Sequence, residues 1–399
     1  MKISFIQPSR NNLKYLKWSY DSIRKNQGDH EVEICVADDA STDGTWDWCL
    51  QKMDEDKHFK AIKNETGRRL GHTILYDRLV NEVATNDICM IYHADMYLCP
   101  YALSAIEKHI KPGVIVSLTR IEPPLHPEGP EKILRGFGLE PEEFTEDKLL
   151  KDVEELRQLH KNDPGFTEGI FAPWAFYKDD FISIGGHDPL YAPQSKEDSD
   201  IFNRFQLNGV QFIQTWEGFV YHMTCRGSRR NTVDKAKNIF EDSPEWLEQN
   251  MRSTRNFIRK WGHFVKHDQY MKPVIPPKYD IGIIVKNCNH SLLHALEPWC
   301  STIYVDETSD KAMIDTYITL ESPNTIMDLY SRIKLYDNEK QNEILVNVDG
   351  LNMNQEDYKI IMQLPDIIKD SGSVGSFELN NLKVDIIKMN EYQNELIKL

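Results

Sequence analysis

The chain has 399 residues, 40% hydrophobic and 28% charged, which is ordinary for a globular protein in water and long enough for a large core in two domains. Its formal charge of −16 excludes non-specific attraction to nucleic acid or anionic membranes, although a local basic patch remains compatible with it. No apolar run is long enough to cross a bilayer, and the N-terminus enters a strand without a signal-peptide pattern, so we expect a cytoplasmic protein without a transmembrane segment.

The first 121 residues alternate between short apolar runs and amphipathic stretches. The apolar runs predict strands at 3–6 (ended by Pro8), 32–37, 61–62, 88–92 and 113–121. Apolar residues that recur every three or four positions predict helices at 13–23, 46–53 and 74–83. This alternation predicts an α/β domain with a Rossmann-like, mostly parallel sheet and right-handed crossovers.

The alternation breaks at residues 122–165. This insertion contains six prolines and many acidic residues, with one helical stretch near 146–160. Long insertions in α/β domains usually cover a site or form mobile surface elements, so we expect this one to shape the acceptor site. The elements predicted after it are a strand at 168–177, a Gly-Gly turn at 185–186, a helix at 195–207 and strands at 210–213 and 219–222.

The last third of the chain begins with a predicted helical connector and a Pro-rich linker, together residues 231–276. Beyond it we predict a smaller α/β accessory domain at 277–399, with strands at 281–285, 302–305, 344–348 and 384–389 and helices near 323–334 and 355–369. It has no glycine-rich phosphate loop and no clustered ligands. We therefore expect packing or partner contacts there, with a homo-oligomer formed through this domain as one form of them.

Cysteines support the expected compartment. The seven lie at positions 35, 49, 89, 99, 225, 288 and 300. Their number is odd, no Cys-x-x-Cys pair occurs, and most lie in apolar runs. We expect reduced thiols in the core of a cytosolic protein.

Polar clusters in the first domain fall at predicted strand ends, where open α/β sheets bind ligands. They are residues 8–11, 38–39, 93–95 and the 197–198 region. Asp95 follows the buried strand 88–92 and offers an oxygen to a hard divalent cation. The alternative is that His93 and Asp95 only cap a following helix.

With these clusters in this order, the chain resembles the family-2 glycosyltransferases of the GT-A fold over about residues 1–230. The motifs that carry the resemblance are the Pro-Ser-Arg-Asn turn at 8–11, the Asp-Asp-Ala-Ser-Thr-Asp-Gly-Thr run at 38–45, the Asp-x-Asp-like triplet at 93–95, the Gly-Gly-His-Asp turn at 185–188, and Lys-Glu-Asp-Ser-Asp at 196–200 followed by Arg204. The resemblance implies an inverting, hexosyltransferase-type enzyme that depends on Mn²⁺ or Mg²⁺. It would move a sugar from a nucleotide-diphosphate sugar, a UDP-sugar being favoured, to a hydroxyl of a carbohydrate or other acceptor.

The resemblance also implies which residues bind the donor. Asp39 would accept a hydrogen bond from the nucleobase, and Arg68 or Arg69 would contact the diphosphate. The full set implied for the nucleotide sugar is Pro8, Ser9, Arg10, Asp39, Arg68, Gly71, His93 and Ala94. The alternatives are that Asp38, Asp39 and Asp43 form only a turn and a helix cap, and that the arginines are solvated.

Metal and catalytic roles follow in the same way. Asp95 and His222 would bind the metal, with His93 standing where the family has its first aspartate. Asp198 would be the general base that removes the acceptor hydroxyl proton. Glu197 and Trp174 would face the acceptor. The alternatives are a hydrogen-bonded core histidine for His222, a core tryptophan for Trp174, and mere N-terminal helix acids for residues 197–200.

Other functions are compatible with parts of the pattern. A sugar-nucleotide pyrophosphorylase would need a glycine-rich, arginine-containing loop directly after the first strand, and residues 8–12 are not one. A non-catalytic nucleotide-sugar-binding or scaffold protein would fit the His93 replacement. A glycosyltransferase acting on a modified nucleic-acid base is disfavoured by the acidic charge, so nucleic acid is not an expected partner.

Overall fold

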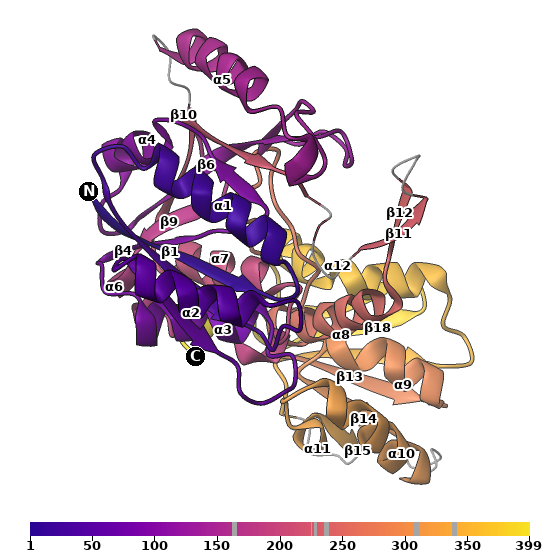
Figure 1. The fold of residues 1–399 in the computed structure, drawn as a ribbon. Helices are drawn as coiled ribbons and strands as arrows, with labels where there is room; N and C mark the ends of the chain where they lie inside the picture. The colour runs from indigo at the N-terminus through magenta and orange to yellow at the C-terminus, as the bar shows by residue number, and fades with distance from the viewer. Residues whose placement is uncertain (162–165, 225, 227–229, 235–238, 307–310, 337–340) are drawn as a thin grey trace. The chain divides into compact units, whose positions relative to one another are not determined.

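The computed structural model describes residues 1–161, 166–224, 226, 230–234, 239–306, 311–336 and 341–399. The chain forms two compact units (Figure 1). The N-terminal unit comprises residues 1–248, 267–273 and 398–399, and the C-terminal unit comprises residues 249–266 and 274–397. Each unit has its own sheet and its own core.

In the described residues, the N-terminal unit contains a ten-stranded sheet in the order β3-β2-β1-β4-β9-β6-β10-β5, with β7 beside β6 and β8 beside β10. Its strands are β1 (Lys2–Ser9), β2 (Glu31–Asp38), β3 (Phe59–Lys63), β4 (Ile88–Ile91), β5 (Met96–Leu98), β6 (Val114–Glu122), β7 (Lys132–Leu134), β8 (Phe166–Thr167), β9 (Trp174–Tyr177) and β10 (Gln211–His222). Strands β3, β2, β1 and β4 are parallel, as are β6 and β10, whereas β9 and β5 run antiparallel to their neighbours. The predicted mostly parallel α/β sheet is confirmed.

Helices connect these strands as predicted for most of the unit. They are α1 (Leu13–Asn26), α2 (Thr45–Glu55), α3 (His72–Arg78) with a π-helical continuation (Leu79–Val83), α4 (Ala102–His109), α5 (Glu146–His160), α6 (Lys178–Ser183) and α7 (Glu197–Leu207). The strands β1, β2 and β4 are buried almost throughout, because helices cover both faces of the parallel part of the sheet.

Strand β1 runs through Pro8 to Ser9, so the predicted end of this strand is wrong. The carbonyl of Ile6 accepts a hydrogen bond from the Tyr92 N–H, so even-numbered positions of β1 direct their backbone groups toward β4. Pairing with β4 stops at Ile6, while pairing with β2 continues to Ser9. The missing N–H of Pro8 therefore faces no strand, and proline costs the ladder no hydrogen bond there.

The insertion packs against the sheet through α5. The apolar side chains of Leu149, Val153 and Leu156 are buried in a cluster with residues of β6 and β10. Ahead of α5, the Glu140 carboxylate accepts hydrogen bonds from Lys14 (2.5 Å) and from the Tyr15 hydroxyl (2.6 Å), both on α1. The insertion thus packs on the N-terminal unit. Its residues 162–165 lie outside the described ones, and its role toward an acceptor stays a prediction.

Two predicted elements differ from the structure. The strand expected at 168–177 is present only as β8 and β9, with irregular chain at 168–173. The helical reading of 231–272 is wrong before 244 and after 261. A hairpin of β11 (Arg230–Asp234) and β12 (Ile239–Asp242) occupies the first stretch, with 235–238 outside the described residues, and irregular chain occupies 262–272. Helix α8 (Pro244–Trp261) begins at a proline, which the first helical position tolerates because its N–H has no helical partner.

The C-terminal unit contains a six-stranded sheet in the order β15-β14-β13-β16-β18-β17. Its elements are β13 (Ile281–Lys286), α9 (His290–Leu296), β14 (Thr302–Val305), α10 (Lys311–Glu321), α11 (Leu329–Arg332), β15 (Ile333–Leu335), β16 (Ile344–Asp349), α12 (Gln355–Ser371), β17 (Gly375–Leu379) and β18 (Leu382–Ile386). Strands β15, β14, β13 and β16 are parallel. Strand β18 runs antiparallel to β16, and β17 runs antiparallel to β18. The predicted smaller α/β domain is confirmed. The helix expected near 323–334 is present only as α11, and α9, α10, β15 and β17 are not among the predicted elements.

A buried ionic cluster holds α8, α10 and α11 of the C-terminal unit together. The Glu297 side chain is 0% exposed and accepts hydrogen bonds from Arg259 Nη2 (2.7 Å) and Arg332 Nε (2.8 Å). Arg259 also bonds Glu321 (2.5 Å). Burial acts to raise the pKa of Glu297, but the two guanidinium groups outweigh it and lower that pKa to about 2.

Two further expectations concern the whole chain. The described cysteines are free thiols, buried except for the partly exposed Cys288, and Cys225 lies outside the described residues. None of the helices in the described part combines the length and the apolar character needed to traverse a bilayer.

Candidate active site

Three of the four predicted polar clusters lie at the carboxyl ends of β1, β2 and β4, whereas the 197–198 region begins helix α7 and follows no strand. Asp39 directly follows β2, and His93 and Asp95 follow β4. His222 is the last residue of β10, and Asp198 lies in the first turn of α7.

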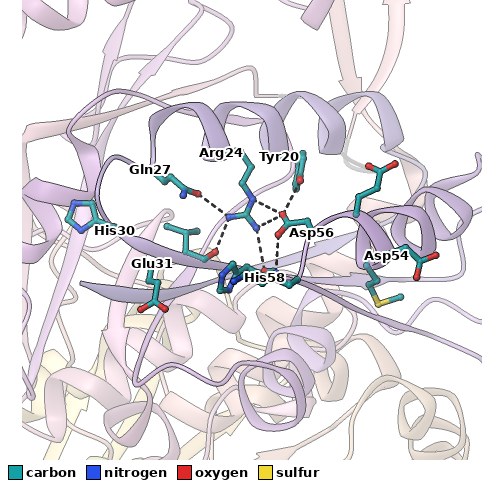
Figure 2. A pocket seen from close by; sticks show the side chains of 12 residues that line it. Tyr20, Arg24, Gln27, His30, Glu31, Asp54, Asp56 and His58 are labelled. Atoms are coloured by element: carbon teal, nitrogen blue, oxygen red, sulfur yellow. Dashed lines mark hydrogen bonds and ion pairs between the residues drawn. The ribbon is translucent and has the colours of Figure 1, made fainter.

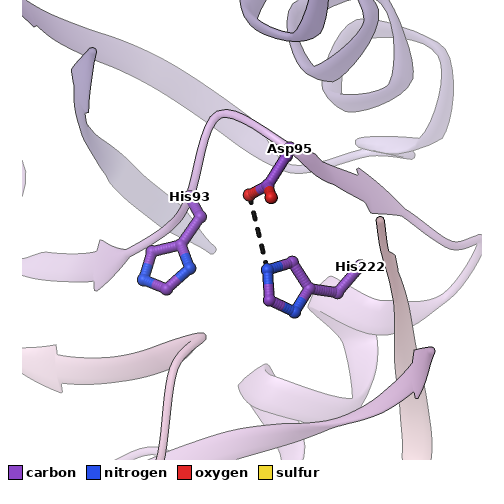
Figure 3. Close-up of side chains that lie close together, drawn as sticks. All are labelled: His93, Asp95 and His222. Carbon is purple, nitrogen blue, oxygen red and sulfur yellow. Dashed lines mark ion pairs between the residues drawn. The ribbon is translucent and has the colours of Figure 1, made fainter. Parts of the chain in front are cut away.

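Three of these side chains form a compact group (Figure 3). Ligand atoms of His93, Asp95 and His222 all lie within 4.8 Å of one another, the one such group of histidine, cysteine and acidic residues in the described part of the chain. His222 Nε2 lies 3.4 Å from Asp95 Oδ1. Strand β5 brings them together, because it pairs with β10 in a register that sets His222 opposite Met96. The helix-cap alternative does not hold, since β5 separates Asp95 from α4, whose N-cap is Tyr101.

Glu122 orients the imidazole of His222. Its Oε1 lies 2.7 Å from His222 Nδ1, and the glutamate is itself held by Arg120 (3.1 Å) and Lys132 (3.4 Å). This contact assigns a proton to Nδ1 and leaves Nε2 facing Asp95. Burial favours the neutral imidazole, but the carboxylates of Asp95 and Glu122 raise the pKa of His222 to about 9.

The group has the chemistry of a divalent cation site. Burial, and then the neighbouring His222, lower the pKa of His93 to about 3, so its neutral ring can act as a ligand. A cation would displace the proton from His222 Nε2, and the glutamate behind Nδ1 is the supporting contact that metal-bound histidines usually have. One carboxylate and two imidazoles suit Mn²⁺ and also admit Mg²⁺.

Asp39 organises the loop that follows β3. Its carboxylate accepts three hydrogen bonds, from Asn64 Nδ2 (2.7 Å), the Leu70 N–H (2.9 Å) and the Gly71 N–H (2.9 Å). The side chain is buried. A carboxylate can accept about four hydrogen bonds, so a nucleobase would have roughly one lone-pair position left. Both readings of Asp39, turn former and base-binding group, are compatible with this arrangement.

Gly71 joins that loop to the loop in front of α7. It has a positive φ of 80°, and a Cβ added there would lie 2.0 Å from the carbonyl oxygen of Pro193. The N–H of Thr73 also points at this oxygen (3.5 Å), and Arg69 hydrogen-bonds Gln194. The loop built on Asp39 therefore rests directly on the segment that leads to Glu197 and Asp198.

We expect the substitution Gly71→Ala to lower the free energy of unfolding of the N-terminal unit by about 1–3 kcal/mol more than Gly67→Ala does. Both glycines have positive φ, but an added Cβ at Gly67 meets nothing within 4 Å, so the control carries the backbone cost alone. Urea unfolding of the two variants measures the difference. Equal destabilisation would contradict the close contact with Pro193.

The acidic residues at the start of α7 have different environments. Asp200 is fully buried and holds Arg204 (2.8 Å), so it is a structural residue. Burial, and then the charge of Asp198, raise the pKa of Glu197 to about 8, which makes it largely a protonated hydrogen-bond donor at neutral pH. Asp198 is exposed and accepts only from the neighbouring Ser199, in the hydrogen bonds that the structure shows. Ser195 and Lys196 both have positive φ, which turns the chain sharply into the helix.

Some of these carboxylates act on the same neighbouring side chains. Burial raises the pKa of Tyr76 on α3, and the charges of Glu197, Asp198 and Asp95 raise it further. Asp39 and Glu197 both act on Arg69. A single phenol thus lies within reach of the Asp95 and Asp198 charges.

The remaining predicted residues are placed as follows. Pro8, Ser9 and Ala94 are buried near these strand ends, and Arg10 and Arg68 are exposed. Trp174 is 2% exposed and packs among Phe176, Phe202 and Phe205, which favours its core alternative.

Sequence reasoning missed three residues of this site. Glu122 was counted as the first residue of the insertion, although it ends strand β6. His72 and Tyr76 lie one turn apart after Gly71, on a helix that was predicted to begin only at 74. The available signal was a histidine and a tyrosine four positions apart, directly after a glycine.

Figure 2 shows a large hollow elsewhere in the N-terminal unit, away from the carboxyl ends of the strands. It is lined by Arg24, Glu31, Asp56 and His58, at the amino ends of β2 and β3. Arg24 there already bonds Asp56 (2.8 Å) and the Val32 carbonyl (2.9 Å). Ligands of open α/β sheets bind at the opposite, carboxyl edge, so we do not assign this hollow a ligand.

In comparison with known proteins, one family model matches part of the N-terminal unit. Residues 4–163 match the model for glycosyl transferase family 2, which confirms the resemblance. No curated protein matches the chain.

Several solved structures are distantly similar. GalNAc-T7 with UDP, GalNAc and Mn²⁺ is 13% identical, with a TM-score of 0.43 over 66% of this chain and 51% of that chain, so this chain spans about half its length. Residues 1–349 of TarS from S. aureus are 16% identical (TM-score 0.40, 65% of this chain and 66% of that one). The mannosyltransferase PcManGT from Pyrobaculum calidifontis, with GDP-Man and Mn²⁺, is 16% identical (TM-score 0.42, 82% and 76%). Likenesses this distant carry no argument about activity.

Proposed function

Residues 4–163 belong to glycosyl transferase family 2, and on that premise we propose that the protein transfers a sugar from a nucleotide-diphosphate sugar to a hydroxyl acceptor with inversion of configuration. The observation that carries the proposal is the site itself. A group of potential metal ligands, the loop built on Asp39 and an exposed carboxylate at a helix N-terminus occur in one unit, and Asp95 and Asp198 both act on the pKa of Tyr76.

The donor would bind along the ends of β1, β2 and β4. Asp39 would accept one hydrogen bond from the base in addition to the three that organise its loop. Arg69 is the stronger choice for the diphosphate, because it is partly buried near Asp39 and Glu197, whereas Arg68 is exposed. A UDP-sugar is the donor that we test first.

His93, Asp95 and His222 would hold the divalent cation. Bound there, the cation would supply positive charge to the departing diphosphate. The chain's own part is to keep His222 oriented through Glu122 and to keep His93 neutral by burial.

Asp198 would be the general base. The reaction needs one group that removes the proton of the acceptor hydroxyl while its oxygen attacks the anomeric carbon from the side opposite the diphosphate. Asp198 lies in the first turn of α7, and its exposure leaves a path for the acceptor. Glu197, largely protonated, would donate a hydrogen bond to a substrate oxygen.

A thermal-shift screen of nucleoside diphosphates with and without Mn²⁺ tests this function. A ligand that binds only the native state at 100 times its Kd stabilises that state by about 2.7 kcal/mol. We expect UDP with Mn²⁺ to raise the melting temperature by several degrees, and UDP alone to raise it less.

The control is Asp95→Asn, which should abolish the increment due to Mn²⁺, measured against the unliganded melting temperature of the same variant. Slow release of nucleoside diphosphate from the matching sugar nucleotide would distinguish an enzyme from a binding protein. The proposal fails if no nucleoside diphosphate stabilises the protein in the presence of either metal.

A further inference from the structure

Helix α3 connects the two halves of the proposed site. At its first residue, the ring of His72 stacks on that of His93, with centroids 6.4 Å apart. At its second residue, the N–H of Thr73 points to the Pro193 carbonyl, in the loop that leads to Asp198. Tyr76 follows one turn after His72, on the same face of the helix, with the two rings 5.6 Å apart.

The Tyr76 ring is held from its other side as well. The ring of His187 stacks on it at 5.5 Å. The Asp77 carboxylate lies 2.7 Å from His187 Nδ1 and accepts a hydrogen bond from the His187 N–H (3.0 Å). These contacts fix the position of His187. The fit is close, because a Cβ added at Gly186 would lie 2.1 Å from Asp77 Oδ2. Supporting contacts of this kind give a side chain one orientation, as a substrate-binding group requires.

The structure shows no hydrogen bond to the Tyr76 hydroxyl in the described part of the chain, and this oxygen, on a residue that is 5% exposed, is not fully buried. Buried tyrosine hydroxyls usually find a partner. Tyr92 also lacks one, but it is 0% exposed and packs edge-on against Phe5, within the core. Tyr76 differs because its ring lies between those of His72 and His187, and the carboxylates of Asp95 and Asp198, from two other segments, act on its pKa.

We infer that Tyr76 binds the donor sugar, its hydroxyl forming a hydrogen bond with a hydroxyl of the sugar that is transferred. The inference rests on the proposed function. In an inverting transfer, the diphosphate leaves on the metal side and the acceptor attacks from the side of the base, so the sugar lies between Asp95 and Asp198. Tyr76 lies within reach of the same two residues, on a helix that contacts both His93 and the loop before α7.

This role predicts that Tyr76 distinguishes a sugar nucleotide from a nucleoside diphosphate. The contacted group is present on the sugar nucleotide and absent from the nucleoside diphosphate. Tyr76 should therefore affect sugar-nucleotide turnover without affecting nucleoside diphosphate binding, whereas a purely structural residue would affect both.

The test is Tyr76→Phe, which removes the hydroxyl and keeps the ring between His72 and His187. The probes are UDP with Mn²⁺ for binding, and the donor that the wild type hydrolyses fastest among UDP-glucose, UDP-galactose, UDP-N-acetylglucosamine and GDP-mannose for turnover. We expect the Kd for UDP to change less than about twofold and kcat/KM for hydrolysis to fall about tenfold or more. Tyr92→Phe, which removes a hydroxyl buried in the core, should change neither the Kd for UDP nor kcat/KM for hydrolysis by more than about twofold.

Deoxy-sugar donors identify the contact. The wild type should lose about the same factor on the analogue that lacks the contacted hydroxyl, and Tyr76→Phe should no longer discriminate against that analogue. Unchanged hydrolysis by Tyr76→Phe, or an equal loss of UDP binding, would overturn the inference while leaving the proposed function in place. A wild type that hydrolyses none of the donors would overturn both.

Discussion

Asp198→Asn is expected to lower kcat for donor hydrolysis by about 100- to 10,000-fold, the range that a general base contributes. Asparagine has nearly the same size and can accept a hydrogen bond from Ser199, but it cannot take a proton from the attacking hydroxyl or water. Binding of UDP with Mn²⁺ should be unchanged, because Asp198 lies on the acceptor side of the proposed site. Single-turnover hydrolysis combined with UDP titration measures both quantities.

The matched control is Asp179→Asn. Asp179 is also an exposed aspartate in the first turn of a helix, α6, so this variant reproduces the change in charge near a helix N-terminus. It should retain hydrolysis within about twofold. If Asp198→Asn kept wild-type turnover, Asp198 would be no more than an N-terminal helix acid, and the catalytic assignment would be withdrawn.

The second large effect is expected in the C-terminal unit, where Glu297→Gln should lower the free energy of unfolding by about 3–5 kcal/mol. The substitution takes the carboxylate partner from Arg332 and leaves Arg259 with Glu321 alone, in a largely buried site. Hydrogen exchange at increasing urea, followed on peptides from β13 and β16, measures the stability of this unit separately from the other. The control Glu356→Gln removes an exposed ion pair with Lys359 and should cost less than about 1 kcal/mol.

The Glu297 effect should also depend on pH. The folded-state pKa of about 2 lies below the ordinary carboxyl value, so the contribution of this group to stability is complete above the unfolded pKa of about 4.3. It is lost as the pH falls from there through 2. The difference between wild type and Glu297→Gln should therefore be constant near neutrality and should shrink below about pH 4. A difference that grew on acidification would contradict the depressed pKa.

Local patterns in the sequence were sufficient for the fold of the N-terminal unit. Strands such as β2 and β4 are continuous apolar runs that end in polar residues, and both their buried character and the position of Asp39 and Asp95 follow from that pattern. The order of the motifs gave a resemblance to a family whose model matches residues 4–163. Elements without such periodicity were missed or misassigned, as with β5 and the β11–β12 hairpin, because their strands are held by pairing rather than by an apolar pattern of their own.

The sequence by itself determined which groups stand at strand ends, since each depends on residues within a few positions of it. Only the tertiary structure decided which of them meet. His222 reaches Asp95 through the register of β5 on β10, and the Asp39 carboxylate is already engaged by the loop that rests on Pro193. Those contacts join residues about 30 to more than 120 positions apart, and their geometry depends on packing between elements, which no local spacing encodes.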